Sequence, residues 1–171
     1  MLLAYFSQER PPLIASRIIG VGSISNVREP DLCVLVEEAG ILSWRIELFG
    51  DGSEEAYVFQ EIQIWGSLIA VGYGHYIHFF NLKLGLNRSY NLDSYFGHIY
   101  SDHDYLLVAS GMKLFRYSQS ANLIWRSSDL GIDGVVVDRV ANGIVSGQGE
   151  WDPPGGWIDY TIDLDSGQSL S

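Results

Sequence analysis

The sequence predicts an all-β protein built from about four similar units of short antiparallel strands. Runs rich in β-branched and aromatic residues alternate with glycine-containing turns, and no run repeats apolar residues at helical spacing over several turns. The clearest unit is a hairpin in which Leu114–Tyr117 and Leu123–Arg126 flank the polar turn Ser118–Asn122. Weaker copies of this hairpin recur along the chain, which is typical of a repeated architecture.

Length and composition indicate a folded protein with one core. The chain has 171 residues, of which 47% are hydrophobic and 18% charged, so we expect a single all-β domain over residues 1–171. Its formal net charge is -11. Phosphate backbones and anionic membrane surfaces would repel such a chain, so we expect no nucleic acid or membrane partner and favour a protein partner with a basic surface.

Cysteine usage and the N-terminal residues favour a cytoplasmic location. Cys33 is the single cysteine and lies in an apolar run, which suits a buried thiol in a reducing compartment. The segment Met1–Phe6 has neither a basic leader nor a small-residue cleavage site. No apolar run approaches the roughly 20 residues that span a bilayer.

The first third of the chain contains four expected strands. A proline pair ends the first strand, and Gly20 and Gly22 interrupt the second. The third and fourth form a hairpin closed by Glu38–Gly40, where the glycine can adopt the positive φ of a tight turn. A polar loop at Gly50–Glu55 follows. The runs are Leu2–Phe6, then Leu13–Ile19 and Val21–Ile24 as the two parts of the interrupted strand, and Asp31–Glu37 and Ile41–Phe49.

From Tyr57 the pattern becomes regular, and the whole chain is expected to hold about 14 to 16 strands. In the last long run, Tyr160, Ile162 and Leu164 alternate with acidic and threonine positions, so one face is buried and the other is wet. The runs are Val58–Trp65, Leu68–Val71, Tyr76–Leu82, Asn87–Leu92, Ile99–Tyr100, Tyr105–Ala109, Met112–Tyr117, Leu123–Arg126, Val135–Asp138, Ile144–Ser146, Trp157–Leu164 and a stub at Gln168–Leu170.

Turn residues repeat at blade-sized intervals. Gly40, Gly85, Ala121 and Gly167 are separated by 45, 36 and 46 residues. Two of these turns continue as Gly-Ile-Leu-Ser-Trp-Arg and Ala-Asn-Leu-Ile-Trp-Arg. On these residues, Leu32–Leu170 resembles blades of the quinoprotein-like and WD-repeat β-propellers, whose outer hairpins often carry a Trp after the turn. Tyr90 stands at the Trp position of the second unit, and the fourth unit ends before it.

The resemblance implies a small β-propeller-like array of about four antiparallel β-meander units. A two-sheet β-sandwich or an open barrel built from the same hairpins is the alternative. Because the last unit lacks a full outer strand, we expect residues 2–6 to pair with it and close the array. Trp44, Trp65 and Trp125 are expected to be structural and to fill gaps between sheets.

No group of residues predicts catalysis, a metal site or a cofactor. Histidines and carboxylates gather between residues 75 and 104, so a divalent metal or small-ligand site near His98, Asp102 and His103 is an alternative. His75 and His78 would point to opposite faces of a strand, and solvated turn histidines are the simpler interpretation. No Gly-x-Ser-x-Gly motif is present, and Cys33 lies inside an expected strand.

An inserted loop at residues 147–156 is the strongest candidate for binding. It is longer than the corresponding links in the other units, and it is acidic and proline-stiffened. We predict partner binding by Glu150, Trp151, Asp152, Pro153, Pro154 and Trp157. The competing interpretation is that Trp151 folds back and caps the core.

Two function classes follow. The first, which we favour, is a non-catalytic protein-interaction module, of which an inhibitor or immunity-type protein for a basic partner is one version. The second is an enzyme or small-ligand binder that uses His98, Asp102 and His103.

Overall fold

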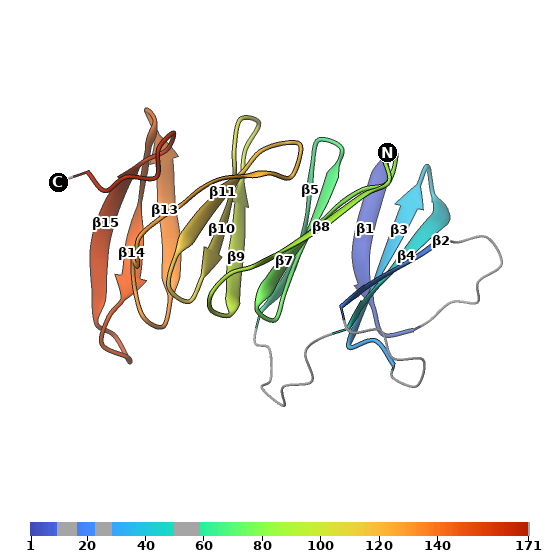
Figure 1. Cartoon of the computed structure of the whole chain (residues 1–171), viewed down its shortest axis with the longest axis horizontal. Helices are drawn as coiled ribbons and strands as arrows, with labels where there is room; N and C mark the ends of the chain where they lie inside the picture. Colours follow the sequence, from blue (N-terminus) through green and yellow to red (C-terminus); the bar gives the residue numbers. More distant parts are fainter. Residues whose placement is uncertain (10–16, 23–28, 50–58, 171) are drawn as a thin grey trace. The chain divides into compact units, whose positions relative to one another are not determined.

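The computed structural model describes residues 1–9, 17–22, 29–49 and 59–170 (Figure 1). These residues form fifteen strands and no helix, which confirms the all-β prediction and the expected number of strands. The loop expected at residues 50–55 lies outside the described residues. The chain divides into two compact units, Met1–Ala56 and Tyr57–Ser171, and each is described by itself. The single domain expected over residues 1–171 stays a prediction.

The first unit is one four-stranded sheet in the order β1-β3-β4-β2. The predicted hairpin is confirmed, because Glu38 pairs with Ile41 and the turn residues Ala39 and Gly40 have positive φ angles of 53° and 80°. Cys33 is buried, as expected. The strands are β1 (Leu2–Ser7), β2 (Arg17–Gly22), β3 (Leu32–Glu38) and β4 (Ile41–Phe49).

One expectation for this unit is wrong, and one stays untested. β2 runs without a break through Gly20 and pairs with β4 in parallel, so this sheet is not a simple antiparallel meander. β1 pairs with β3 from Leu2 opposite Glu38 to Ser7 opposite Cys33. β1 is therefore an edge strand of the first unit's own sheet, and the closure that we expected between residues 2–6 and the last unit stays a prediction.

The second unit consists of three antiparallel meander sheets, in agreement with the predicted propeller-like array. Its first and second sheets have four strands each, and the third has three. The strands are β5 (Gln60–Trp65), β6 (Leu68–Tyr73), β7 (Tyr76–Asn81) and β8 (Leu86–Asn91); β9 (Phe96–Ser101), β10 (Leu106–Ser110), β11 (Leu114–Tyr117) and β12 (Leu123–Arg126); and β13 (Val135–Ala141), β14 (Ile144–Glu150) and β15 (Trp157–Asp163).

Alternation along β10 explains how these three sheets pack. Leu106 and Val108 belong to a core shared with β5–β8, whereas Leu107 and Ala109 belong to a core shared with β13–β15. All four are fully buried, because the middle sheet is covered on both faces. Within this unit the sheets therefore stack as three layers, and neither a two-sheet sandwich nor an open barrel describes them.

Aromatic residues on two outer strands connect each sheet to the next. The Tyr90 hydroxyl of β8 donates to the Ala121 backbone oxygen at 2.7 Å, and the Trp125 indole of β12 donates to the Leu164 oxygen at 2.8 Å. The structural role predicted for Trp125 is confirmed, and so is that of Trp65, which donates to the Asp102 oxygen at 2.7 Å.

The expected equivalence of Trp44 and Trp125 is wrong. Trp44 is half-buried on β4, which lies inside its sheet, whereas Trp125 is buried on the outer strand β12. The turn positions themselves do repeat. Gly85, Ala121 and Gly167 have positive φ angles of 65°, 59° and 70°.

Candidate partner-binding surface

The predicted binding residues lie on the hairpin that joins β14 to β15. Glu150 is the last residue of β14 and pairs with Trp157, the first residue of β15. The loop between them is Trp151–Gly156, shorter than expected, because residues 147–149 belong to β14. It is still longer than the links from β6 to β7 and from β10 to β11.

Hydrogen bonds within the hairpin fix its conformation. The Trp151 amide donates to the Gly156 oxygen and the Gly156 amide donates to the Asp152 oxygen, both at 2.9 Å. The Glu150 carboxylate accepts the Gly155 amide at 2.7 Å. The Glu150 side chain therefore organises the loop as well as contributing negative charge. These bonds are all internal to residues 150–156.

Both hairpin tryptophans are partly accessible. Trp151 and Trp157 are each 40% exposed, and Asp152, Pro153 and Pro154 are exposed as well. Trp157 lies over Gly134, where an added Cβ would be 2.9 Å from its Cη2 atom. Trp151 belongs to neither buried cluster of the second unit. This arrangement favours a binding role for Trp151 over a core cap.

The segment that leads into β13 lies beside the hairpin, a contact that no sequence pattern predicted. The Ile132 amide donates to the Glu150 oxygen at 2.7 Å, and the Glu150 amide donates to the Gly134 oxygen at 2.9 Å. Ile132 is 49% exposed and so adds apolar surface near Trp157. The only signal in the sequence was an isoleucine within a turn-like Gly-Ile-Asp-Gly, which no local pattern connects to residue 150.

We define the hairpin surface as four exposed apolar residues together with four acidic residues around them: Ile132, Trp151, Trp157 and Ile158, with Asp133, Glu150, Asp152 and Asp159. None of these four carboxylates forms an ion pair with any residue that the structure describes. They also affect neighbouring groups. Burial raises the pKa of Tyr95 to about 12, with further contributions from the nearby Asp133 and Glu150 carboxylates. The Tyr95 hydroxyl donates to the Asp133 backbone oxygen.

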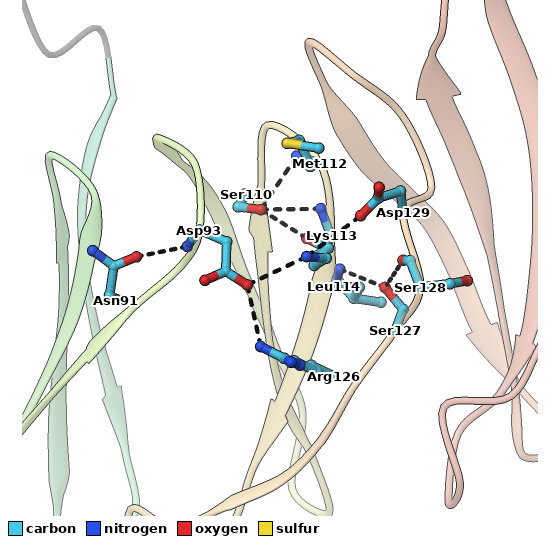
Figure 2. Close-up of polar contacts among 10 residues, drawn as sticks. All are labelled: Asn91, Asp93, Ser110, Met112, Lys113, Leu114, Arg126, Ser127, Ser128 and Asp129. Carbon is cyan, nitrogen blue, oxygen red and sulfur yellow. Dashed lines mark hydrogen bonds and ion pairs between the residues drawn. The ribbon is translucent and has the colours of Figure 1, made fainter.

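A second charged cluster is neutralised internally. Figure 2 shows Asp93 between Lys113 and Arg126, each 3.3 Å from the Asp93 carboxylate. Lys113 also lies 3.4 Å from Asp129. These contacts connect the segment between β8 and β9 to β11 and β12. Lys113 and Arg126 compensate the charges of Asp93 and Asp129. The carboxylates of the hairpin surface have no such cation among the described residues.

The alternative site is not assembled. His98 lies on β9 with its Nδ1 atom 3.6 Å from Glu61 and its ring beside Phe59. Asp102 and His103 lie in the β9–β10 turn, where the Asp102 carboxylate accepts the His103 amide. No described contact joins His98 to either of them. Among the described residues no group of three or more His, Cys, Asp or Glu side chains could hold a metal ion.

One histidine differs from the expectation of a solvated turn residue. His78 is only 6% exposed, on β7, with its Nδ1 atom 2.7 Å from the Ser89 hydroxyl. Burial lowers its pKa to about 4. Its role is in packing, and its ionisation affects stability.

Among the described segments there is no helix long and apolar enough to cross a membrane. No protein-family model matches the chain, and no curated protein matches it in sequence. Among solved structures, the chain is similar to the Pan2 WD40 domain of Neurospora crassa, with a TM-score of 0.48 and 10% identity. The match covers 81% of this chain and 45% of that chain.

Proposed function

We propose that this protein is a non-catalytic protein-interaction module whose hairpin surface binds a partner with a basic surface. The observation that carries the proposal is the pair of partly exposed tryptophans, Trp151 and Trp157, on a hydrogen-bonded hairpin among carboxylates that form no ion pair with a described residue. Tryptophan is enriched among the residues that dominate binding energy, because it buries a large area with few rotatable bonds. Pre-ordering of the hairpin lowers the entropic cost of association.

The acidic residues determine the kind of partner. Four carboxylates around the tryptophans, on a chain with a net charge of -11, would steer a basic surface toward the hairpin and raise the association rate. An inhibitor or immunity-type protein that covers the basic cleft of a nucleic-acid-cleaving enzyme is the specific role that this charge and size favour. We place this role in the cytoplasm, because a sequence with the single cysteine Cys33 has no internal disulfide framework.

The test compares Trp151→Ala with the parent protein as bait in native lysate, followed by affinity measurement on the partner that is enriched. We expect the variant to lose about 2 kcal/mol of binding free energy, roughly a thirtyfold weaker Kd, while its Tm stays unchanged. Leu84→Ala is the matched control, because Leu84 is 78% exposed and lies outside the hairpin surface. Binding to Trp151→Ala at full affinity, with a Tm several degrees lower, would show that Trp151 caps the core.

A further inference from the structure

Three aromatic rings lie side by side near the first strands of two meander sheets. Phe59 immediately precedes β5, Tyr95 immediately precedes β9, and His98 lies on β9. The Phe59 ring centroid is 5.2 Å from that of His98 and 6.3 Å from that of Tyr95. Neither Phe59 nor His98 belongs to a buried cluster of the second unit, and both are partly exposed within it. We call these three residues the aromatic strip.

A carboxylate is fixed beside the strip. Glu61 reaches from β5 to β9, where one of its oxygens accepts the Ile99 amide at 2.9 Å and lies 3.6 Å from the His98 Nδ1 atom. The bond from Ile99 holds the carboxylate in place. Its second oxygen accepts no hydrogen bond from a described residue, and no described Lys or Arg pairs with it. The strip therefore has a positioned negative charge with one oxygen left for a further donor.

Tyr95 connects the strip to the hairpin surface. Its hydroxyl donates to the Asp133 backbone oxygen at 2.6 Å, and the Asp133 amide donates to the Glu150 oxygen at 3.3 Å. Asp133 and Glu150 both belong to the hairpin surface, and Tyr95 stacks on Phe59. A partner that occupies the hairpin surface would thus reach Phe59 by extending across Tyr95.

We propose that the aromatic strip and Glu61 bind an arginine side chain of the basic partner. This inference rests on the proposed function and adds a second contact beyond Tyr95. Aromatic faces attract cations, and the weakly hydrated guanidinium stacks on rings more readily than the compact, strongly hydrated ammonium of lysine. A guanidinium on Phe59 also has several N–H donors in one plane, so the same group can donate to the second Glu61 oxygen.

The combination of rings and charge disfavours other occupants. An acidic or phosphate-bearing segment would be repelled by Glu61 and Asp133, on a chain with a net charge of -11. A purely apolar segment would cover the Glu61 carboxylate without giving its second oxygen a donor, which is costly. The chain's own Lys113 and Arg126 already pair with Asp93 (Figure 2). A planar cation from the partner matches both the rings and the carboxylate.

The probe is the end-blocked peptide acetyl-Gly-Arg-Gly-amide, titrated at low salt into the full chain labelled with ¹⁵N and followed by amide NMR. The Ile99 amide is the reporter, because it donates to Glu61. We expect a saturable shift of the Ile99 signal with the arginine peptide and weaker binding of the lysine peptide by roughly two- to fivefold. The citrulline peptide has nearly the same shape without the charge, and we expect no saturable shift from it.

Two substitutions test the ring and the charge separately. Phe59→Leu keeps apolar bulk but removes the ring, and should weaken binding of the arginine peptide by roughly two- to fivefold. Glu61→Gln keeps an acceptor for the Ile99 amide but removes the charge, and should weaken binding by about fivefold or more. Asp104→Asn is the matched control, because it removes one exposed carboxylate from the β9–β10 turn and should leave binding unchanged.

Several results would overturn the proposal. Citrulline binding as well as arginine, or Phe59→Leu binding at parent affinity, would show that the charge or the ring has no part in recognition. Shifts at Asp152 and Asp165 as large as that at Ile99 would show a general attraction of cations to the acidic chain. Free L-arginine binding more tightly than the blocked peptide would assign the site to the amino acid in place of a partner's side chain.

Two further outcomes separate this inference from the proposed function. If Trp151→Ala abolishes partner binding while Ile99 does not respond to the arginine peptide, the arginine site is overturned and the hairpin surface stands. If Ile99 responds as expected and the partner binds Trp151→Ala at full affinity but Glu61→Gln weakly, the arginine site stands and the hairpin surface is overturned.

Discussion

The Trp125 indole of β12 donates a hydrogen bond of 2.8 Å to the backbone oxygen of Leu164, at the end of the neighbouring sheet. The same ring packs on Gly167, where an added Cβ would lie 2.6 Å from its Cδ2 atom. Arg116 donates to the same Leu164 oxygen at 2.8 Å and pairs with Asp165. The second and third sheets of this unit are therefore held together by a polar bond inside an apolar contact.

Replacing Trp125 separates these two contributions. Trp125→Phe keeps much of the apolar contact but loses the donor, and Arg116 still satisfies the Leu164 oxygen, so we expect a cost of about 1–2 kcal/mol. Trp125→Ala should cost about 3–5 kcal/mol. Urea unfolding measures both. Ile124→Ala is the control, since Ile124 is 48% exposed on the same strand and should change stability by less than about 0.5 kcal/mol. Equal losses for Phe and Ala would assign the whole effect to the hydrogen bond.

Tyr117 offers a substitution that should stabilise the protein. Its side chain is 1% exposed and packed against Phe79 and Tyr90, and its hydroxyl has no hydrogen-bond partner among the described residues. A buried, unsatisfied hydroxyl is costly, so Tyr117→Phe should raise the free energy of unfolding by about 1 kcal/mol.

The matched control for Tyr117→Phe is Tyr90→Phe, which removes the hydroxyl that donates to Ala121 and should lower stability by about 1 kcal/mol. The two variants delete the same atom from neighbouring rings, and urea unfolding compares them directly. A loss of stability in Tyr117→Phe would mean that its hydroxyl is satisfied, for example by a buried water molecule.

Local patterns in the sequence were sufficient for the strands and hairpins. The apolar run Leu106–Ala109 and the turn residues Gly85, Ala121 and Gly167 behave as expected, because alternation and positive φ are properties of a few consecutive residues. The pairing of β1 with β3 and of β2 with β4 was not predicted. These pairings join segments separated by other strands, and no local signal chooses among several apolar partners.

The candidate surface was predictable in part for the same reason. The hairpin from Glu150 to Trp157 is contiguous, so an unusual loop was visible in the sequence. Ile132 and Asp133 are connected to this hairpin by backbone hydrogen bonds to Glu150. In the sequence, nearly the whole of β13 and β14 separates them from Glu150, so no local pattern connects them. His98 and Asp102 show the opposite error. They are close in sequence, but their described contacts involve different neighbours.

Buried His78 should make stability depend on pH. In the unfolded chain it titrates near 6.5, whereas in the folded chain burial lowers its pKa to about 4. Below pH 6.5 the unfolded state therefore takes up a proton that the folded state excludes. The stability supplied by neutral His78 is present above pH 6.5 and is lost as the pH falls toward 4, by at most about 3 kcal/mol.

Comparison with His78→Asn isolates this contribution from the effect of the many carboxylates. We measure the free energy of unfolding in urea at pH 7.5 and at pH 4.5. We expect the parent to lose more stability between these two pH values than His78→Asn does. His103→Asn, a change in an exposed turn, is the control and should follow the parent. A parent and a His78→Asn variant that respond identically to pH would show that His78 is protonated at no cost.

The Glu150 carboxylate should control the order of the hairpin as well as its charge. It accepts the Gly155 amide at 2.7 Å, and that amide is otherwise at the exposed tip of the loop. Glu150→Gln keeps a carbonyl acceptor at the same place, whereas Glu150→Ala removes it. Amide hydrogen exchange followed by NMR should therefore show fast exchange at Gly155 in Glu150→Ala and slower exchange in Glu150→Gln, with the β14–β15 ladder still protected in both. If Gly155 exchanges equally fast in the parent protein, the hairpin is not held by Glu150, and the low ordering cost that we assign to partner binding loses its basis.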